Sequence, residues 1–426
     1  MSRTRTLLAL TALAAVTGTG AGALVLSTTT SGTPYGRIRW GGAGAAHDVQ
    51  LTRTGGQISK DAPPPSSAAG AGSSEVAPYA LDQTFLLHSR SGSTRKIYLD
   101  FTGHTTSGTR WNSDFTNGNA LVSAPFDTDG RAGFSAAEDA VVQKVWQSVR
   151  EDFAPFDVDV TTQDPGVEAL RKSSADDTSY GVRVVVSPTA SWYPNAGGVG
   201  YYYSFTSSVE TPVFVFTDLS QRSKFVGEAA AHEVGHSLGL HHDGSPAGEY
   251  FAGQGNWAPI MGNSYSRTVT QWSKGEYDGA NNTEDDLAVI TSNGLSYRPD
   301  DVLGTVDTTA TLPAGTVRYG VLERTGDVDA YKFSINSSHT LRLRGWNNVG
   351  TGVDANLNLR GVLRTSTGVV KASANSTTGQ GFDTTVTLSP GTYVLYVNGM
   401  GEGSPATTGY SSYDSLGHYG VELTWA

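Results

Sequence analysis

The sequence contains no cysteine among its 426 residues, and this absence removes whole classes of chemistry. Disulfide bonds, iron–sulfur clusters and thiol nucleophiles are excluded, and so is latency imposed by a cysteine on an active-site metal. Methionine is almost as scarce, with 3 residues, and charged residues make up only 16% of the chain. The formal net charge of −11 disfavours binding to nucleic acid, so we expect no nucleic-acid partner.

Long apolar segments are also few, and the informative one lies near the N-terminus. A basic stretch ends at Thr6, an apolar segment runs from Leu7 to Val16, and the small residues Ala21 to Ala23 follow. This order is typical of a secretory signal peptide over residues 1–23, so we expect a secreted, extracellular protein. A membrane anchor is the alternative, but no later segment is long enough to span a bilayer, and we expect no stable membrane association.

What the chain does have is a cluster of histidines in the pattern H-E-x-x-H-x-x-G-x-x-H-D, from His232 to Asp243. If residues 223–238 are helical, His232 and His236 lie one turn apart on the same face and can hold one ion. Gly239 lets the backbone leave the helix, so His242 can supply a third nitrogen. Three imidazoles and a water form the open arrangement of catalytic Zn²⁺.

Glu233 stands next to the first histidine, where it can act on a metal-bound water instead of binding the metal. The metal lowers the pKa of that water toward about 7 and polarises a carbonyl group. The carboxylate can then take the proton from the water and pass it to the leaving amine. The pattern therefore predicts peptide-bond hydrolysis by a metal-activated water, with Glu233 as the general base.

These residues resemble the metzincin metallopeptidases, whose extended motif is matched at all five defining positions: His232, Glu233, His236, Gly239 and His242. The resemblance implies an α+β metzincin-like catalytic domain with a long active-site helix, which we place at residues 85–299. The spacing of the family favours His242 as the third ligand over its neighbour His241, which we expect at the surface or in the substrate cleft.

A second element supports the resemblance, because metzincins carry a Met-turn beneath the metal. Here the segment from Ala258 to Tyr265 contains Met261, which the resemblance places as an apolar floor under the histidines. Some metzincins have a functional Tyr two residues after that Met, but this chain has Asn263 there, which argues against such a role for Tyr265. Asp243 is implied to be a structural residue.

Local patterns predict the remaining elements of this region. A capping box at Ser135 opens a helix to about Phe153 with an apolar stripe. The resemblance implies an edge strand that pairs antiparallel with a bound peptide, which makes the glycine- and tyrosine-rich segment at 197–205 a candidate wall of the substrate cleft, with ordinary sheet packing as the alternative. The segment from Asp127 to Glu138 has some features of an EF-hand but lacks its glycine, so we predict a turn. Strands are predicted at 95–101, 156–162, 182–186 and 213–216.

Residues 24–84 are rich in Gly, Ser, Ala, Thr and Pro, with the clearest linker sequence from Pro63 to Gly70. We expect no compact core there. Two interpretations stay open: a pro-segment that keeps a protease latent, as in a zymogen, or a flexible linker. The sequence singles out no residue of this segment that would block a metal.

From residue 300 to 426 the helix signals stop and short β-runs separated by turns take over, as in a β-sandwich. The motifs at 326–331 and 390–393 resemble the bacterial pre-peptidase C-terminal (PPC) domain, which implies an all-β jelly-roll-like sandwich. Asp327 and Asp329 are candidate ligands for a structural Ca²⁺. Strands are predicted at 317–321, 330–334, 340–343, 357–363, 384–388 and 393–397.

Taken together, the sequence predicts a secreted, monomeric zinc metalloendopeptidase that acts on protein or peptide substrates. One alternative is a secreted binding or adhesion protein with a non-catalytic metal site. The intact Glu233 argues against it, because a structural zinc site needs no general base. Another alternative is a zinc hydrolase of non-peptide amide bonds, which cleavage of an unstructured protein would distinguish.

Overall fold

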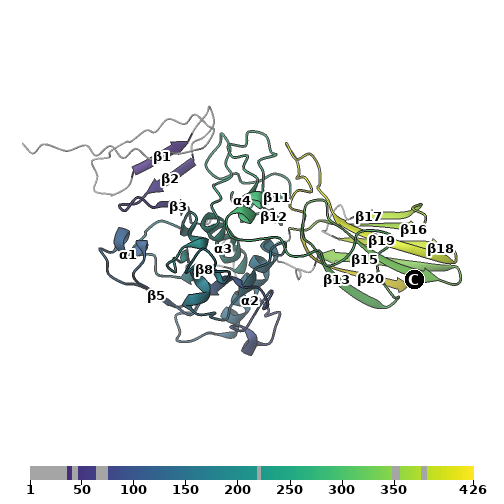
Figure 1. Cartoon of the computed structure of the whole chain (residues 1–426), viewed down its shortest axis with the longest axis horizontal. Helices are drawn as coiled ribbons and strands as arrows, with labels where there is room; N and C mark the ends of the chain where they lie inside the picture. The colour runs from purple at the N-terminus through teal and green to yellow at the C-terminus, as the bar shows by residue number, and fades with distance from the viewer. Residues whose placement is uncertain (1–35, 41–46, 64–74, 218–221, 348–355, 376–380) are drawn as a thin grey trace, which may run out of the picture.

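The structure, a computed structural model, describes residues 36–40, 47–63, 75–217, 222–347, 356–375 and 381–426. The expected signal peptide at 1–23 lies outside the described residues. The N-terminal strands and the C-terminal strands lie on opposite sides of a mixed α/β region that contains the long helix α3 (Figure 1). Within the described residues, no helix is both long and apolar enough to cross a membrane.

The centre of the α/β region is an eight-stranded sheet in the order β1-β2-β3-β9-β10-β8-β4-β7. Four of its strands are parallel neighbours, and β9 pairs antiparallel with β10. The predicted strands are confirmed, although the strand expected at 156–162 is shorter. The bounds are β4 Arg95–Asp100, β7 Asp159–Thr161, β8 Tyr180–Ser187, β9 Gly198–Tyr201 and β10 Val213–Phe216.

Both faces of this sheet are covered, and the alternation along β8 shows how. Val184 and its period-two neighbours Val182 and Val186 join the large hydrophobic cluster that includes the two long helices. Val185 points to the other face and joins a smaller cluster with Trp111. Because β8 is buried on both faces, its sequence is a continuous apolar run and not an alternating one.

Two helices lie against the sheet and pack on each other: α2 (Ala136–Asp152) and α3 (Ser223–Ser237). Ser135 and Glu138 form the predicted capping box at the start of α2. At the end of α3, Gly239 adopts φ +99°, and a Cβ there would lie 2.3 Å from the ring of Tyr203. Only glycine satisfies both constraints, so the chain can turn back toward the helix at this point.

The N-terminal strands are a correction to the sequence-based expectation of no compact core over residues 24–84. Strands β1 (Gly36–Trp40), β2 (His47–Leu51) and β3 (Gln57–Asp61) form antiparallel pairs, and β3 pairs with β9. Ile58 is fully buried in the same cluster as Trp111. Composition missed β3 because its apolar residue Ile58 packs against residues far along the chain.

Several short elements complete the α/β region. The turn predicted between Asp127 and Glu138 is present, with Asp127 Oδ1 accepting hydrogen bonds from two backbone N–H groups. Glu138 is engaged in the helix cap and accepts a hydrogen bond from Thr128 N at 2.7 Å. The other elements are β5 His104–Thr106, α1 Arg110–Phe115, β6 Leu121–Ser123, β11 Trp257–Pro259, β12 Val269–Gln271 and α4 Asp286–Ser292.

The C-terminal region consists of two four-stranded antiparallel sheets that share one hydrophobic cluster. The six predicted strands are present, and two more, β17 and β20, were not anticipated. One sheet contains β13 (Thr316–Leu322), β20 (Gly417–Trp425), β15 (His339–Asn347) and β18 (Phe382–Leu388). The other contains β14 (Val328–Ile335), β19 (Gly391–Gly399), β16 (Leu359–Thr365) and β17 (Val370–Asn375).

The junction between these sheets and the α/β region is formed by buried side chains. Trp272 is 1% exposed, its indole N–H donates to Asp152 O at 2.8 Å, and its backbone N–H donates to Asp414 Oδ2 at 2.7 Å. His418 Nδ1 contacts Glu151 Oε2 at 2.9 Å. The hydrophobic cluster of the α/β region continues without interruption into the C-terminal sheets.

Candidate metal centre

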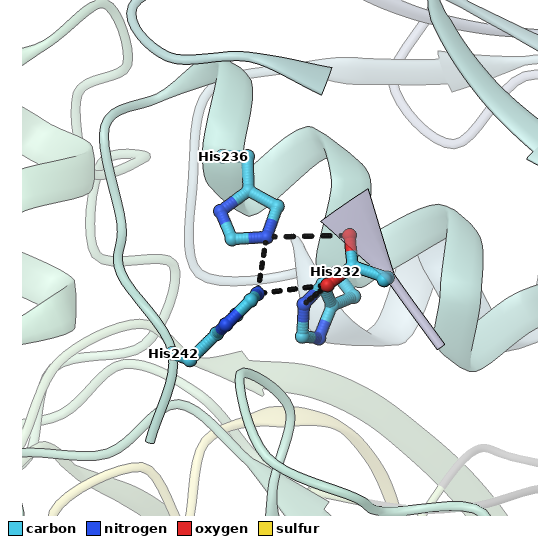
Figure 2. A group of neighbouring side chains, drawn as sticks. His232, His236 and His242 are labelled. Atoms are coloured by element: carbon cyan, nitrogen blue, oxygen red, sulfur yellow. Dashed lines mark hydrogen bonds and ion pairs between the residues drawn. The ribbon is translucent and has the colours of Figure 1, made fainter. Parts of the chain in front are cut away.

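The three histidines of the motif converge on one point (Figure 2). His232 and His236 extend from the same face of α3, and His242 returns to them after the turn at Gly239. His236 Nε2 and His242 Nε2 are 3.0 Å apart, close to the separation of about 3.3 Å expected for two nitrogens bound to one tetrahedral zinc ion. All three side chains are buried.

Each imidazole is held at its far nitrogen by a hydrogen bond. His232 Nδ1 donates to Ile260 O at 2.8 Å, and His236 Nδ1 donates to Leu240 O at 2.7 Å. His242 Nδ1 donates to Glu249 Oε1 at 2.8 Å. With Nδ1 carrying the proton, the lone pair of each Nε2 faces the centre, which is the tautomer that metal ligation requires.

Glu233 lies beside the histidines beneath strand β9. A Cβ on Gly198 would lie 2.0 Å from Glu233 Oε1, and one on Gly200 would lie 3.1 Å from Oε2. The glycines in β9 therefore let its backbone pass directly over this carboxylate. Burial, together with the neighbouring Asp61, raises the pKa of Glu233 well above its usual value.

Met261, in the segment that the sequence predicts as a Met-turn, packs against the helix of the histidines. Met261 is fully buried, and a Cβ on Gly235 would lie 2.6 Å from its Sδ, so the methionine packs directly against α3. Asp243 is also buried, and its backbone N–H donates to Met261 O at 2.8 Å, which ties the third histidine to the Met-turn. His241 Nδ1 lies 3.4 Å from Glu284 Oε2, and its ring stacks on the ring of Tyr202.

A fourth side chain, Asp61 of β3, enters the cluster, and the sequence did not point to it. Its Oδ1 lies 2.7 Å from His242 Nε2 and 3.2 Å from His232 Nε2, and its Oδ2 lies 3.6 Å from His236 Nε2. Tyr250 OH donates to Asp61 Oδ1 at 2.9 Å. The potential ligand atoms of Asp61 and the three histidines all lie within 4.8 Å of one another.

The donor set fits a divalent metal. Three buried atoms at the centre, Asp61 Oδ2, His232 Nε2 and Glu233 Oε2, have no hydrogen-bond partner among the described residues. Unpartnered buried polar atoms are costly, and a cation coordinated by nitrogen and oxygen atoms would satisfy Asp61 Oδ2 and His232 Nε2. The structure therefore provides a buried group of one aspartate and three histidines that can bind a metal.

The protonation states are consistent with this arrangement. Burial lowers the pKa of His236 to about 4, which keeps the ring neutral, as a ligand must be. Burial also acts to lower the pKa of His242, but Asp61 and Glu249 outweigh it and raise that pKa to about 9, so metal binding there displaces a proton. Burial acts to raise the pKa of Asp61, but the three histidines hold it well below its usual value.

Three residues at the centre were missed by sequence reasoning: Asp61, Tyr250 and Glu249. Tyr250 and Glu249 lie in the irregular segment between the third histidine and the Met-turn, where neither periodicity nor a motif marks them. The only local indication of Asp61 was that residues 57–61 alternate as in a strand, and the small and polar residues around this stretch made it resemble a linker. Tyr250, and not a residue of the Met-turn, is the tyrosine that bonds into the cluster.

Comparison with known families agrees with this geometry. Residues 153–243 match the Metallo-peptidase family M12B Reprolysin-like. The chain therefore contains a metallopeptidase domain. The matched residues end at Asp243 and include α3 and all three histidines, so the metallopeptidase assignment rests on the part of the chain that carries the metal centre. M12 metallopeptidases use zinc, and proteases act on protein or peptide substrates.

Two other comparisons concern the whole chain. A search of curated proteins found no match. Among solved structures, the pre-peptidase C-terminal domain of a collagenase from Bacillus anthracis matches with 19% identity over 30% of this chain and 99% of that chain, with a TM-score of 0.20.

A second group of carboxylates lies in the C-terminal region and contains both predicted calcium ligands. Asp327 and Asp329 come together with Asp300, with oxygen atoms within 4.8 Å of one another. The Tyr419 hydroxyl donates to Asp329 Oδ2, but Asp329 Oδ1 and both oxygens of the fully buried Glu323 have no hydrogen-bond partner among the described residues. Burial and the neighbouring aspartates raise the pKa of Glu323 to about 9.

Proposed function

We propose that this metallopeptidase is a secreted, zinc-dependent endopeptidase of the metzincin type, and that it is made as a zymogen. The observation that carries the proposal is the convergence of three Nε2 atoms beside the buried carboxylate of Glu233. In this proposal His232, His236 and His242 are the metal ligands and Glu233 is the catalytic residue. The chain acts as a monomer outside the cell.

The residues of the chain have distinct parts in the proposed reaction. A zinc ion supplies a Lewis acid that polarises a peptide carbonyl and lowers the pKa of a water molecule. Glu233 takes a proton from the attacking water and delivers it to the nitrogen of the leaving amine. Burial of Glu233 beneath β9 keeps bulk solvent from competing for that proton.

Strand β9 orients the peptide substrate in this proposal. Its outer edge accepts an antiparallel strand, as the pairing with β3 demonstrates. A substrate in that position would run directly above Glu233, because the glycines of β9 bring its backbone over the carboxylate. Main-chain hydrogen bonds would hold peptides of many sequences, which suits an endopeptidase.

Glu233→Gln tests the proposal, because it keeps the shape of the side chain and removes the base. We expect casein hydrolysis by the purified protein, assayed intact and after limited proteolysis, to fall at least about 10²-fold while the zinc content stays at one ion per chain. The matched control is Glu228→Gln on the same helix, whose carboxylate accepts a hydrogen bond from Ser264. If wild type and Glu233→Gln both hold zinc and neither cleaves any peptide, the endopeptidase proposal fails.

We also propose that residues 85–299 form the catalytic domain and residues 300–426 a PPC-like domain that binds Ca²⁺. Unpartnered oxygens on Asp329 and Glu323, beside Asp300 and Asp327, support the cation site, because Ca²⁺ takes six to eight such oxygens. Added CaCl₂ is expected to raise the melting temperature of the zinc-loaded protein. Ca²⁺ at about 100 times its Kd would add about 2.7 kcal/mol of stability.

The calcium proposal has its own variants. Asp329→Asn should remove the response to CaCl₂, whereas Asp307→Asn, at an exposed aspartate outside the group, should retain it. An unchanged response in Asp329→Asn would exclude this group as the site of calcium binding. Differential scanning calorimetry at several CaCl₂ concentrations gives the comparison directly.

A further inference from the structure

We infer that Asp61 is a fourth metal ligand in the intact chain, and that strand β3 thereby holds the metallopeptidase site closed. The inference rests on the proposed function, since it concerns the regulation of the same site. The composition of the N-terminal segment left open whether it keeps a protease latent, and the inference names Asp61 as the residue that does so. It also identifies β3 as an internal occupant of the substrate position.

The first line of evidence is the position of the Asp61 carboxylate. Its two oxygens reach all three histidines, at 2.7, 3.2 and 3.6 Å. The Asp61 side chain is 7% exposed, so it has left water for a site where Oδ2 finds no hydrogen-bond partner among the described residues. A buried carboxylate needs a compensating positive charge, and a divalent cation at the centre of three imidazoles supplies it.

The second line is the pairing of β3 with β9. The strands are antiparallel with Asp61 opposite Gly198 and Ile58 opposite Tyr201, and Gly197 N donates to Asp61 O at 2.7 Å. A substrate strand needs the same edge of β9, so it cannot pair there while β3 is in place. Asp61 therefore blocks the site in two ways: its carboxylate occupies a ligand position, and its backbone occupies the substrate edge.

The third line is the packing between the two segments. A Cβ on Gly197 would lie 2.7 Å from Ala62 O, so the glycine permits a backbone approach that any side chain would prevent. Ser59, two residues before Asp61 and on the same face of β3, places its Oγ 2.9 Å from His242 Nε2. Tyr250 bonds to Asp61 Oδ1 from the opposite segment. Strand β3 therefore makes specific contacts with the histidine cluster and does not merely cover the sheet.

The ends of the hairpin β2–β3 show how it is held. At its turn, Thr54 N and Thr54 Oγ1 donate to the two oxygens of Asp114 at 2.8 and 3.0 Å. Within β3, Ile58 is fully buried between the hairpin and the α/β region. Lys60 points away from the centre, with Nζ donating to Pro194 O at 3.1 Å, and so provides a matched control next to Asp61.

The test loads the full-length protein with Co²⁺ in place of zinc and records its visible absorption, which reports the ligands of the ion. Asp61→Asn keeps the size of the side chain and replaces the carboxylate by a weaker ligand, Asp61→Ala removes the ligand, and Lys60→Ala leaves it. We expect the cobalt spectrum to change in both Asp61 variants and to stay unchanged in Lys60→Ala. Cleavage by trypsin after Arg53 reports whether the hairpin is still paired.

A small metal-binding probe measures how open the site is. Acetohydroxamate should bind the cobalt-loaded Asp61→Ala variant at least about tenfold more tightly than wild type or Lys60→Ala. The reason is that the probe no longer competes with the Asp61 carboxylate for a position on the ion. Casein hydrolysis should increase in parallel in the zinc-loaded Asp61→Ala variant. The double variant that adds Glu233→Gln should bind the probe as tightly as Asp61→Ala and lose the hydrolysis.

The outcomes separate the inference from the function on which it rests. Identical cobalt spectra and identical acetohydroxamate affinity in wild type and both Asp61 variants would overturn the inference, whatever the peptidase activity. A changed spectrum and tighter probe binding without cleavage of any peptide would uphold Asp61 as a ligand and count against the endopeptidase proposal. A changed spectrum in Asp61→Asn with unchanged trypsin resistance would show that the carboxylate itself, and not loss of the hairpin, is responsible.

Discussion

The hairpin of residues 47–63 and the C-terminal sheets of residues 316–425 are both attached to the same α/β region, but in different ways. The hairpin joins it through main-chain pairing with strand β9, through the buried side chain of Ile58 and through one carboxylate at the candidate metal centre. The C-terminal sheets join it through buried side chains such as Trp272 and Asp414, and they share its main hydrophobic cluster. Release of the hairpin exposes only the part of the smaller hydrophobic cluster around Ile58, whereas release of the C-terminal sheets opens the main hydrophobic cluster.

This difference implies different stabilities. Burial of apolar surface supplies most of the free energy of folding, so the C-terminal sheets and the α/β region should unfold together. The hairpin contributes few large apolar side chains, with Ile58 and Val49 fully or almost fully buried. We therefore expect it to open locally at a lower free energy than the rest of the molecule.

The largest effect is expected from Trp272→Ala at the junction with the C-terminal sheets. Removing this buried indole leaves a cavity and removes the hydrogen bond to Asp152 O, which should lower the free energy of unfolding by about 3–5 kcal/mol. Urea unfolding followed by fluorescence and by circular dichroism measures the loss. The matched control is Trp425→Ala, because that side chain is 55% exposed, and a change of less than about 0.5 kcal/mol is expected there. Separate unfolding transitions for the two regions would contradict the shared core.

The next effect concerns the hairpin. Ile58→Ala should weaken its packing by about 3 kcal/mol, but the loss should fall on local opening and not on global unfolding. Hydrogen exchange is expected to speed up at the backbone amides of β2 and β3 while the urea midpoint stays nearly constant. If the midpoint falls as far as in Trp272→Ala, the hairpin belongs to the same cooperative unit as the core.

A pH-dependent effect is expected at Asp414, where burial raises the carboxyl pKa well above the usual value of 3.8. The folded state then keeps a proton that the unfolded state has lost, so this group reduces stability as the pH rises above about 4. One such group lowers the free energy of unfolding by at most about 1.4 kcal/mol per pH unit, and this decrease stops once the pH passes the pKa of the folded state. Asp414→Asn keeps the acceptor for Trp272 N, so its stability should exceed that of wild type at pH 7 and match it below pH 4. If the free energies of unfolding of wild type and Asp414→Asn differed by the same amount at every pH, the raised pKa of Asp414 would be contradicted.

The smallest effect is expected at the tip of the hairpin. Thr54→Val removes the hydroxyl bond to Asp114 Oδ2 at a partly exposed site, which should cost about 1 kcal/mol of local stability. The backbone bond from Thr54 N remains. Trypsin cleavage after Arg53 should become several-fold faster while the thermal midpoint stays unchanged. An equal cleavage rate would show that the tip contributes nothing to holding β3 on β9.

Much of the metal centre could be predicted because its residues are close in sequence. Helical periodicity brings His232 and His236 together, and a glycine with positive φ after the helix returns the chain so that His242 can join them. The same local rules predicted the capping box of α2 and most strands of both regions. Each of these features depends on interactions within one or two turns or along one strand.

The missed features all depend on long-range pairing. Asp61 meets the histidines only because β3 lies on β9, which is about 140 positions further along the chain. The strands β17 and β20 were missed for a related reason, since their partners in the sheets are not marked by local sequence. Tyr250 and Glu249 reach the centre from an irregular segment whose path is set by packing against the Met-turn.

By itself, the sequence determined the three histidines, the glutamate beside them and the helix that carries them, because local backbone geometry brings near neighbours together in a fixed orientation. Only the tertiary structure decided that a carboxylate from the N-terminal segment completes the centre and that the edge of β9 is covered by the chain's own strand. Such a contact depends on which strand edge is free when the sheet assembles. The burial of residues such as Ile58, far from the histidine motif, determines that β3 pairs with β9. The local sequence around Asp61 does not indicate this pairing.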